Sequence, residues 1–372
     1  MIDRQDVLAS VARQTNAIRA TIQFVHEHPE LGHEEHECSR HLRDTLAAAG
    51  LEVEQGVGGM ETAFRATLRG ERPGATVGLV CLYDAVTAIR PDGRVEPVHS
   101  CGHGPISGGI VGAARALAEL RQELAGTLVV MGCPSDEIHA PGSIARGGGK
   151  ALSAEAGLWD EVDTALYAHP EYIDTVSLES RWMQRATAVV SGSRSLTTAD
   201  QPPLEAALAA LETTRAHVPD DLMLERLVLD GDVEEGTGLV LRATFLVFAD
   251  AEDDVEPRLA ALQATVPQAR WELGRVVEAV RPDDRVTAAV AGAFDTLDRD
   301  FVSNPPRLPF ATDFGNISRR CPAALIGVGR EGGWSFHTDE GEAQFASPEG
   351  EAAAITIAQV LALAAADLTE PR

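Results

Sequence analysis

The sequence predicts an α/β protein with a smaller α+β domain inserted into a larger one. Short apolar runs at 75–84, 126–134 and 162–170 have the length of buried strands. Helical spacing between these runs, as at 105–122, is typical of a sheet that helices cover on both faces. The middle of the chain, 181–280, follows the order β-α-β-β-α-β of the ferredoxin-like split βαβ unit. A complete unit of this kind between two α/β halves indicates a separate domain.

The remaining elements follow from the same periodicities. Helices are expected before the first strand, at 5–24 and 33–49. In the insertion we expect strands at 181–191, 222–230, 239–249 and 269–280, helices at 203–216 and 253–265, and an acidic turn at 230–238. The chain then returns to a helix, a strand and an alanine-rich helix, at 285–299, 322–329 and 349–366.

Length and charge limit the possible partners. A chain of 372 residues suits one large domain and one smaller domain. The net charge of -26 argues against nucleic acid, since proteins that bind phosphate backbones present basic surfaces. An anionic small-molecule substrate stays possible, because a bound metal ion can reverse the local field.

The N-terminus and the cysteines bear on the compartment. The first 15 residues form an amphipathic pattern without the apolar segment of a signal peptide, and no run of 18 apolar residues suggests a membrane span. The five cysteines are scattered, with no C-x-x-C pair, which is not the pattern of a disulfide framework. We therefore expect a cytoplasmic protein that does not bind a membrane.

Four short clusters carry residues that could do chemistry. Cys101 and His103 flank one glycine, whose tolerance of tight backbone angles lets two ligand atoms face one point. Asp136 and Glu137 directly follow an expected strand, so that one carboxylate can bind metal while the other accepts a proton. His169 stands before a proline at another strand end, which holds it extended.

The fourth cluster, at 336–339, adds His337 behind a glycine-rich loop. Each cluster alone suits an ordinary structural loop. Together they supply sulfur, nitrogen and oxygen ligands for two divalent cations, and two metals that share a water molecule form a hydrolytic device. Asp84, at the end of the first apolar strand, would orient a ligand imidazole. The His- and Glu-rich run at 26–36 falls between two expected helices, where polar residues cap and solubilise, and we do not expect metal there.

The ordered motifs HEHPELGHEE, LYDAV, HSCGHG, CPSDE, AHPE and HTDE resemble metallopeptidase family 20, in its amidohydrolase branch of aminoacylases, small carboxypeptidases and dipeptidases. The segment ATDFGNIS at 311–318 is similar to one group of that branch. The resemblance implies a catalytic α/β domain at 1–178 and 285–372, and an inserted lid at 179–284 that mediates homodimerisation. It also implies two zinc or manganese ions and a small-molecule substrate.

The resemblance assigns a role to each candidate position. Asp136 takes the place of the general base and Asp84 that of the aspartate that orients a ligand. The implied metal ligands are Cys101, His103, Glu137, His169 and His337.

Three departures concern the substrate. Asp136 replaces a glutamate and is one methylene shorter. An insertion after Glu137 brings in His139, either as a proton carrier or as a surface residue. The lid segment at 191–200 has no histidine where relatives bind substrate or the oxyanion. Candidate substrate contacts are Asn316, His139, Arg181, Arg185 and Arg194, although the three arginines equally suit the solvated edge of a strand.

Three functions remain open from the sequence. The first is metal-dependent hydrolysis of an amide-type C–N bond in an N-acyl amino acid or dipeptide-like molecule. The second is hydrolysis of an aryl or heteroaryl C–N bond with release of ammonia, which the changed base and lid would suit. The third is a small-molecule-binding protein that kept the fold and lost catalysis.

Overall fold

The chain divides into two compact units. The computed structural model describes residues 2–90, 92–192, 207–209, 211–212, 221–230 and 239–371. The larger unit comprises 1–179, 280–306 and 313–372, and the smaller one comprises 180–279 and 307–312. Compared with the expected insertion at 179–284, residues 280–284 lie with the larger unit and the segment 307–312 lies with the smaller one.

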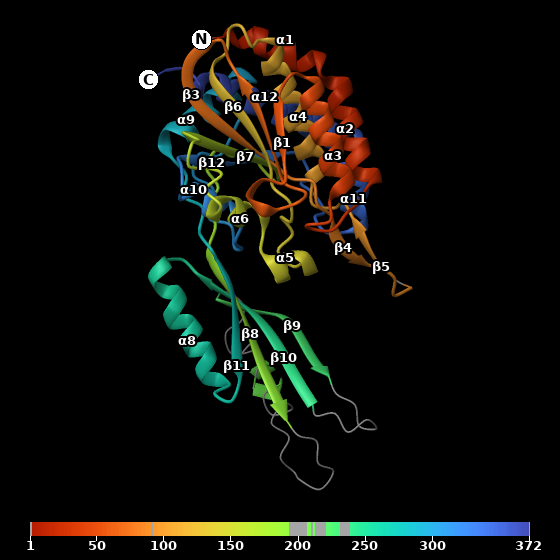
Figure 1. Ribbon diagram of the computed structural model, residues 1–372, viewed down its shortest axis with the longest axis vertical. Coiled ribbons are helices and arrows are strands. Elements are labelled where there is room, and N and C mark those ends of the chain that lie inside the picture. Colours follow the sequence, from red (N-terminus) through yellow and green to blue (C-terminus); the bar gives the residue numbers. More distant parts are fainter. Residues whose placement is uncertain are drawn as a thin grey trace. The chain divides into compact units, whose positions relative to one another are not determined.

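A six-stranded sheet forms the centre of the larger unit (Figure 1). Its order is β1 (Glu52–Gln55), β2 (Phe64–Arg69), β6 (Ala125–Gly132), β3 (Arg72–Cys81), β7 (Thr164–Glu171) and β12 (Ala323–Gly329). The last four run parallel, and β1 and β2 add an antiparallel edge. The carboxyl ends of the parallel strands therefore meet at one edge of the sheet, where α/β proteins place their ligands.

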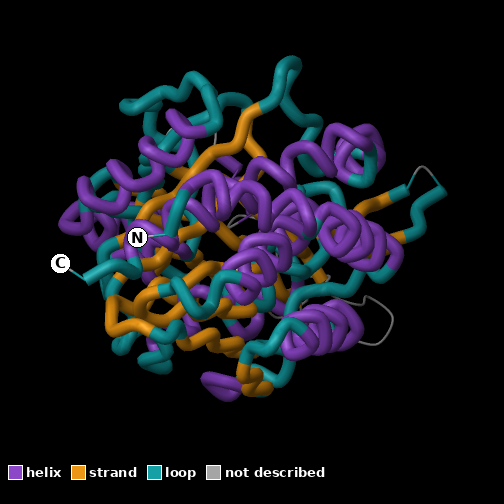
Figure 2. The backbone as a smooth tube through the Cα atoms, turned by 90° about the horizontal axis from the view of Figure 1, so that it is seen from above, coloured by secondary structure: helices purple, strands orange, loops and turns teal. Residues whose placement is uncertain are grey.

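The long helices of the larger unit pack against the sheet and one another (Figures 1 and 2). They are α1 (Arg4–Arg13), α2 (Thr15–Glu27), α3 (His36–Ala48), α4 (His103–Glu119), α9 (Asp284–Thr296) and α12 (Pro348–Leu368). The single helix expected at 5–24 is two helices, because the backbone of Gln14 departs from helical geometry, with φ -89° and ψ 0°. Its side chain donates a 2.6 Å hydrogen bond to Glu119 on α4, which fixes the break.

Short elements complete the larger unit. They are the hairpin β4 (Val86–Ile89) and β5 (Val95–Val98), the helices α5 (Pro141–Arg146), α6 (Gly149–Glu155), α10 (Phe314–Ser318) and α11 (Asp339–Phe345), and a 3-10 turn at Val57–Gly59. Near the two ends of the chain, which lie side by side in both views, Arg4 on α1 pairs with Asp367 on α12 at 2.5 Å (Figures 1 and 2).

Helix α12 meets the length and hydropathy criteria for a membrane span, although the sequence predicted no such stretch. Two thirds of its most apolar window, 67%, is buried inside the protein. It packs against α4 and α9 in the larger unit. Such burial is also found in the core helix of a globular protein, so length and hydropathy are weak evidence for a membrane span.

The smaller unit contains an antiparallel sheet in the order β11 (Arg270–Val277), β8 (Trp182–Gly192), β10 (Leu239–Ala249) and β9 (Leu222–Asp230). Helix α8 (Val255–Thr265), which follows a 3-10 turn at Glu252–Asp254, packs on β8 and β10. This order is that of the expected ferredoxin-like unit. The helix expected at 203–216 is described only at 207–209 and 211–212, which are helical, and residues 231–238 of the expected turn lie outside the described residues.

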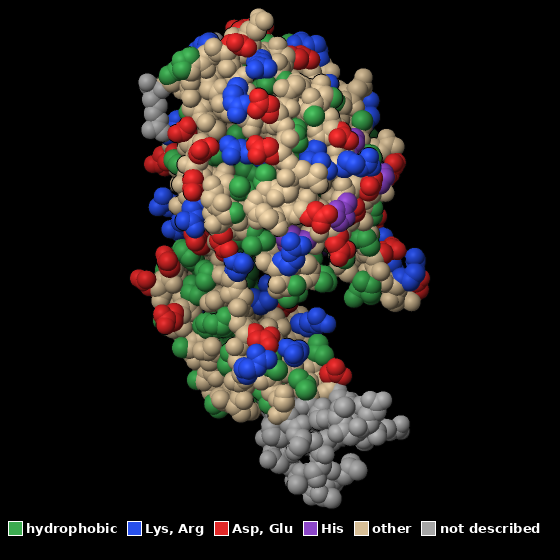
Figure 3. Space-filling model, viewed as in Figure 1, with side chains coloured by type: hydrophobic (Ala, Val, Ile, Leu, Met, Phe, Trp, Pro, Cys, Tyr) green, Lys and Arg blue, Asp and Glu red, His purple; other side chains and the backbone are tan. Residues whose placement is uncertain are grey.

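Charges on the surface are mixed in sign. On the face of the molecule in Figure 3, acidic and basic side chains alternate among the residues that the structure describes. All five cysteines lie in the described part of the chain and none forms a disulfide, as their scatter predicts.

Candidate metal centre

The predicted ligands, and Asp84 that was expected to orient one of them, come from separate segments of the larger unit that end at one edge of its sheet. Asp84 follows β3, Glu137 follows β6 and His169 lies near the end of β7. His337 comes after β12, while Cys101 and His103 stand at the start of α4. The parallel arrangement of the strands thus brings together residues that are far apart in the sequence.

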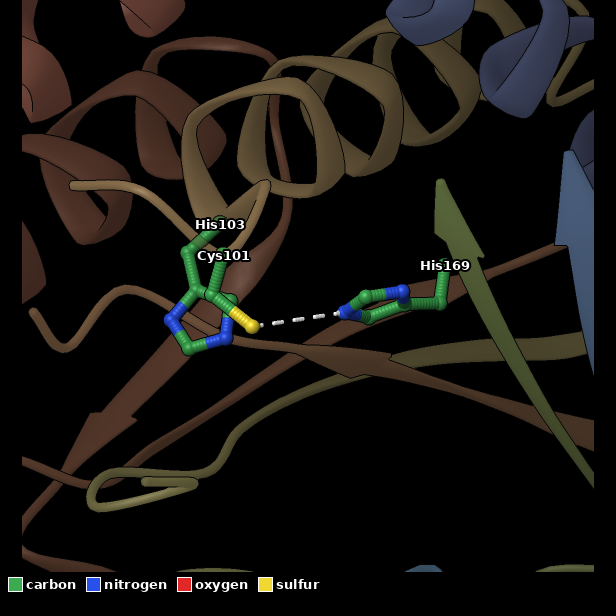
Figure 4. Close-up of side chains that lie close together, drawn as sticks. All are labelled: Cys101, His103 and His169. Atoms are coloured by element: carbon green, nitrogen blue, oxygen red, sulfur yellow. Dashed lines mark hydrogen bonds between the residues drawn. The ribbon is translucent and has the colours of Figure 1, made fainter. Parts of the chain in front are cut away.

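The five predicted ligands form two groups that share one cysteine. Cys101, His103 and His169 offer ligand atoms that all lie within 4.8 Å of one another. Cys101, Glu137 and His337 meet the same limit. In Figure 4 the Cys101 sulfur points toward the His169 ring, and its distance to Nε2 is 3.8 Å. Two neighbouring groups of ligand atoms suit two cations held side by side, as in two-metal hydrolytic sites.

Gly102 allows Cys101 and His103 to face the same point. Its φ is +102°, a region that favours glycine, and it precedes the first residue of α4. An added Cβ would lie 2.9 Å from the Pro170 ring, so a larger residue would also push away the strand that carries His169.

Hydrogen bonds orient the imidazoles of His103, which is buried, and of His169, which is partly buried. Nδ1 of His103 hydrogen-bonds to the Asp84 carbonyl oxygen at 2.6 Å, and Oδ1 of the same residue lies 3.2 Å from it as an ionic contact. Nδ1 of His169 lies 2.6 Å from the Pro170 carbonyl oxygen. Each Nδ1 therefore carries the hydrogen, which leaves Nε2 as the nitrogen available to a metal.

Glu137 and His337 are also held in place. The Glu137 amide donates a 2.9 Å hydrogen bond to Oδ2 of Asp84, and its carboxylate lies between two imidazoles. Oε1 is 3.8 Å from Nε2 of His103, and Oε2 is 3.7 Å from Nε2 of His337. His337 has a φ of +58°, a strained value for a residue with a side chain, and its amide donates to the Ser100 carbonyl at 2.8 Å.

The buried donor set fits a cation. Nε2 of His103, Oε1 of Glu137 and Oδ1 of Asp84 are buried and have no hydrogen-bond partner among the described residues. Unpaired polar atoms in a protein interior cost free energy, and they are rare in native structures. Coordination by the first two of these atoms would remove part of that cost, and the mixture of sulfur, nitrogen and oxygen donors suits borderline-soft divalent ions.

Charges in the cluster shift its pKa values. Burial, followed by the nearby Glu137 carboxylate, raises the pKa of the Cys101 thiol to about 12. Burial also raises the pKa of Glu137 to about 7. Burial opposes the charged form of His103, but Asp84 and Cys101 together outweigh it and raise the pKa of His103. A divalent cation would reverse the first two shifts, because it stabilises the thiolate and the carboxylate.

Asp136 borders the cluster and meets a residue that the sequence reasoning missed. Its Oδ2 lies 3.3 Å from Nε2 of His103, and its Oδ1 accepts a hydrogen bond from Lys150 on α6. Lys150 is fully buried and also pairs with Asp313 at 2.8 Å. Composition is the signal that could have revealed it, because Lys150 is the only lysine in the chain.

The candidate substrate contacts fall in both units. In the larger unit, His139 is exposed in the loop before α5, and its charge contributes to lowering the pKa of His337, after burial, His103 and His169. Asn316 is buried on α10, a helix that packs against α6.

The candidate arginines belong to the smaller unit or lie outside the described residues. Arg181 pairs with Asp250 at 2.9 Å and with Asp221 at 3.0 Å. Arg185 pairs with Glu225 at 2.7 Å. Both guanidinium groups are thus engaged by carboxylates of their own unit, and Arg194 lies outside the described residues.

Comparison with known proteins identifies the family of the chain. Residues 83–364 match the model of the peptidase family M20/M25/M40. The chain belongs to this family. Relatives in the family include thermostable carboxypeptidase 1 of Saccharolobus solfataricus, which is 33% identical over 151 residues, 39% of this chain and 37% of that protein. A p-aminobenzoyl-glutamate hydrolase component of Escherichia coli is 31% identical over 156 residues, 39% of this chain and 30% of that protein.

The matches to these relatives thus span only 37% and 30% of their length. Solved structures cover the whole fold. A putative aminohydrolase from methicillin-resistant Staphylococcus aureus has a TM-score of 0.69 at 19% identity, covering 99% of this chain and 100% of the other. A Bacillus subtilis protein, YXEP, described as a dinuclear metal binding peptidase, has a TM-score of 0.67 at 20% identity, covering 97% and 99%. At this identity they confirm the predicted two-part fold and no more.

Proposed function

We propose that this protein is a metal-dependent hydrolase that cleaves an amide-type C–N bond in a small N-acyl amino acid or dipeptide-like substrate. The observation that carries the proposal is the pair of ligand groups that share Cys101. One group would hold a cation through Cys101, His103 and His169, and the other through Cys101, Glu137 and His337. Zinc or manganese suits this donor set.

When bound, the two cations would acidify a water molecule and stabilise negative charge on the substrate carbonyl oxygen. Asp136 would accept the proton of that water on Oδ2, the oxygen that faces His103. Asp84 would hold the His103 ring and the Glu137 backbone in a fixed relative position, because it accepts hydrogen bonds from both. Returning the proton from Asp136 to the leaving nitrogen would complete the cleavage.

The names of the relatives support this class of substrate. One is an N-acyl-L-amino acid amidohydrolase of Geobacillus stearothermophilus, 26% identical over 153 residues, 39% of this chain and 38% of that protein. With the carboxypeptidase and the p-aminobenzoyl-glutamate hydrolase, these relatives are hydrolases named for acyl-amino acid or peptide substrates.

The first experiment is a substrate screen of protein reconstituted with zinc or manganese, with Asp136→Asn as the matched control. We expect acyl release from N-acyl amino acids or dipeptides, and a kcat about 10²–10⁴ lower in Asp136→Asn, because the amide cannot accept the proton. Metal content should be unchanged in this variant. Ammonia release from aminoaromatic compounds without acyl product would favour the aryl C–N alternative. No turnover above that of Asp136→Asn would refute the proposal.

The proposal includes a homodimer formed through the smaller unit, which would act as a lid. Among the described residues, β9 and β11 are the outer strands of its sheet, and each exposes an apolar side chain, with Met223 48% and Leu273 49% exposed. Unpaired strand edges are ready to pair with another chain. Sedimentation equilibrium should give twice the chain mass, and a monomer at micromolar concentration would contradict this part.

A further inference from the structure

The lysine beside the candidate base is unusual in this chain. The sequence holds 31 lysine and arginine residues, and all but Lys150 are arginines. Lysine therefore occurs at a single position of the chain, and arginine supplies all its other permanently charged cations. That position is fully buried in the larger unit.

The surroundings of Lys150 explain why an arginine side chain would not fit at this position. Its Nζ pairs with Oδ1 of Asp136 and with Oδ1 of Asp313, at 2.8 Å for the latter, and lies 5.4 Å from the centre of the Tyr167 ring. A compact ammonium group can meet two carboxylates and a ring face from different directions, whereas a planar guanidinium needs more room and a fixed fork geometry.

The backbone holds Asp313 firmly. Its Oδ2 accepts a 3.0 Å hydrogen bond from the Ala151 amide, and its side chain is almost fully buried. Gly148 lets this carboxylate approach, because an added Cβ there would lie 2.3 Å from Oδ2. Asp313 is thus a rigid anchor for the ammonium group of Lys150.

The same ammonium group also donates a hydrogen bond to Oδ1 of Asp136. With Oδ1 held by the ammonium group, Oδ2 is the oxygen that lies 3.3 Å from Nε2 of His103. The side chain of Asp136 is 14% exposed and would otherwise be able to turn. A base that is one methylene shorter than glutamate depends more on such a constraint, since small misplacements of a reacting group cost large factors in rate.

We propose that Lys150 is a positioning residue for the base Asp136. Anchored by Asp313, its ammonium group holds one carboxylate oxygen of Asp136 so that the other faces the metal-binding cluster. This inference rests on the proposed function for its catalytic consequence. The competing explanation is that Lys150 only neutralises the buried charge of Asp313.

The kinetic test uses the double variant Lys150→Met, Asp313→Asn. The single variant Lys150→Met would leave Asp313 buried and unpaired, and could fail to fold for that reason alone. The double variant removes both charges of the anchor. We expect a folded protein with unchanged metal content, a KM within about threefold of the wild type and a kcat about 100-fold lower. A kcat within about twofold of the wild type would show that Lys150 serves only Asp313, and would overturn the proposal.

A matched control removes an ion pair elsewhere in the same unit. Arg299 pairs with Asp174 at 2.7 Å, and neither residue belongs to the predicted site. Arg299→Met, Asp174→Asn should keep the wild-type kcat. An equal loss of kcat in this control would assign the effect of the Lys150 variant to general destabilisation and overturn the proposal.

A second readout needs no substrate. Labelling with ¹⁵Nζ-lysine gives one side-chain ammonium signal, because the chain has one lysine. We expect Asp136→Asn and Asp313→Asn each to shift this signal and to speed its hydrogen exchange. An unchanged signal in Asp136→Asn would overturn the proposal. Because this measurement is independent of turnover, it separates a failure of the positioning role from a failure of the proposed hydrolase function.

Discussion

Two regions of the larger unit, the run at 26–36 and the cluster around Cys101, contain the same residue types but differ in how their side chains are bonded. In the run at 26–36, several side chains already form hydrogen bonds to backbone groups, although Nδ1 of His33 has no partner among the described residues. Nδ1 of His28 lies 2.8 Å from the Phe24 carbonyl, and the two rings stack at 4.0 Å. Nε2 of His33 lies 2.8 Å from the Gly147 carbonyl, and Glu30 accepts hydrogen bonds from the first turn of α3.

In the cluster around Cys101, by contrast, buried ligand atoms remain without hydrogen-bond partners in the described structure. Both groups of side chains that are close enough to hold a metal, among the described residues, contain Cys101. The difference teaches that the number of donors does not make a metal site. Loops at the ends of parallel strands bring several donors to one point, whereas the side chains of the turn between two helices bond separately to different parts of the protein.

The largest expected effect tests this contrast directly. Cys101→Ala, His169→Ala should lose nearly all bound metal and all measurable turnover, because it removes the shared ligand and a ligand of one group. His28→Ala, His36→Ala removes as many donors from the other region and should keep the wild-type metal content. Elemental analysis of protein purified without added metal measures both. Equal metal loss in the two variants would break the comparison.

Glu35 is the residue of the histidine-rich run that connects the two regions. It is fully buried, and its carboxylate accepts hydrogen bonds from the Ser135 amide at 2.7 Å and the Thr62 hydroxyl at 2.8 Å. Burial, followed by the charge of Asp84, raises its pKa from 4.5 to about 8. As pH rises between these values, the unfolded chain loses this proton before the folded one, so the folded state loses stability.

Glu35→Gln should remove that dependence. Relative to this variant, the wild-type free energy of unfolding should be highest below pH 4.5 and fall by up to about 1.4 kcal/mol per pH unit until about pH 8. Urea denaturation of metal-free protein at several pH values measures it, with the exposed Glu34→Gln as control. A wild-type curve parallel to that of Glu35→Gln would contradict the raised pKa.

The smallest expected effect concerns Glu30. Its carboxylate accepts hydrogen bonds from the amides of Glu37 and Cys38, at 3.0 and 2.9 Å, and so caps α3, which has no cap from its own preceding residue. Glu30→Gln should cost about 1 kcal/mol of stability, since it removes the charge at a helix N-terminus and one acceptor oxygen. Thermal unfolding measures this loss, and kcat should not change. A large loss of activity would give this run a role in the site.

Much of the fold could be predicted because its elements are strongly periodic. The strands expected at 222–230 and 239–249 match β9 and β10 residue for residue. Strand β1 was missed, because its four residues show no alternation of buried and exposed positions. Helix α5 was missed because it is a six-residue element inside an insertion rich in glycine and proline.

The sequence indicated the ligand residues of the candidate site, but not the side chains that hold them in position. The motifs named Cys101 and Glu137, whose spatial convergence the parallel strands then explain. The role of Asp313 was not visible, because the contact between residues 150 and 313 joins two segments far apart in the chain. Long-range ion pairs of this kind depend on tertiary packing and leave no local pattern.

The single buried lysine also provides a way to measure how often the structure around α6 opens. A protease that cuts only after lysine has one peptide bond to attack, between residues 150 and 151, and that bond lies within α6. With Lys150 fully buried, cleavage requires α6 to open. Cleavage yields the fragments 1–150 and 151–372. When opening and closing are fast compared with cleavage, the rate of this reaction measures the fraction of molecules in which α6 is open.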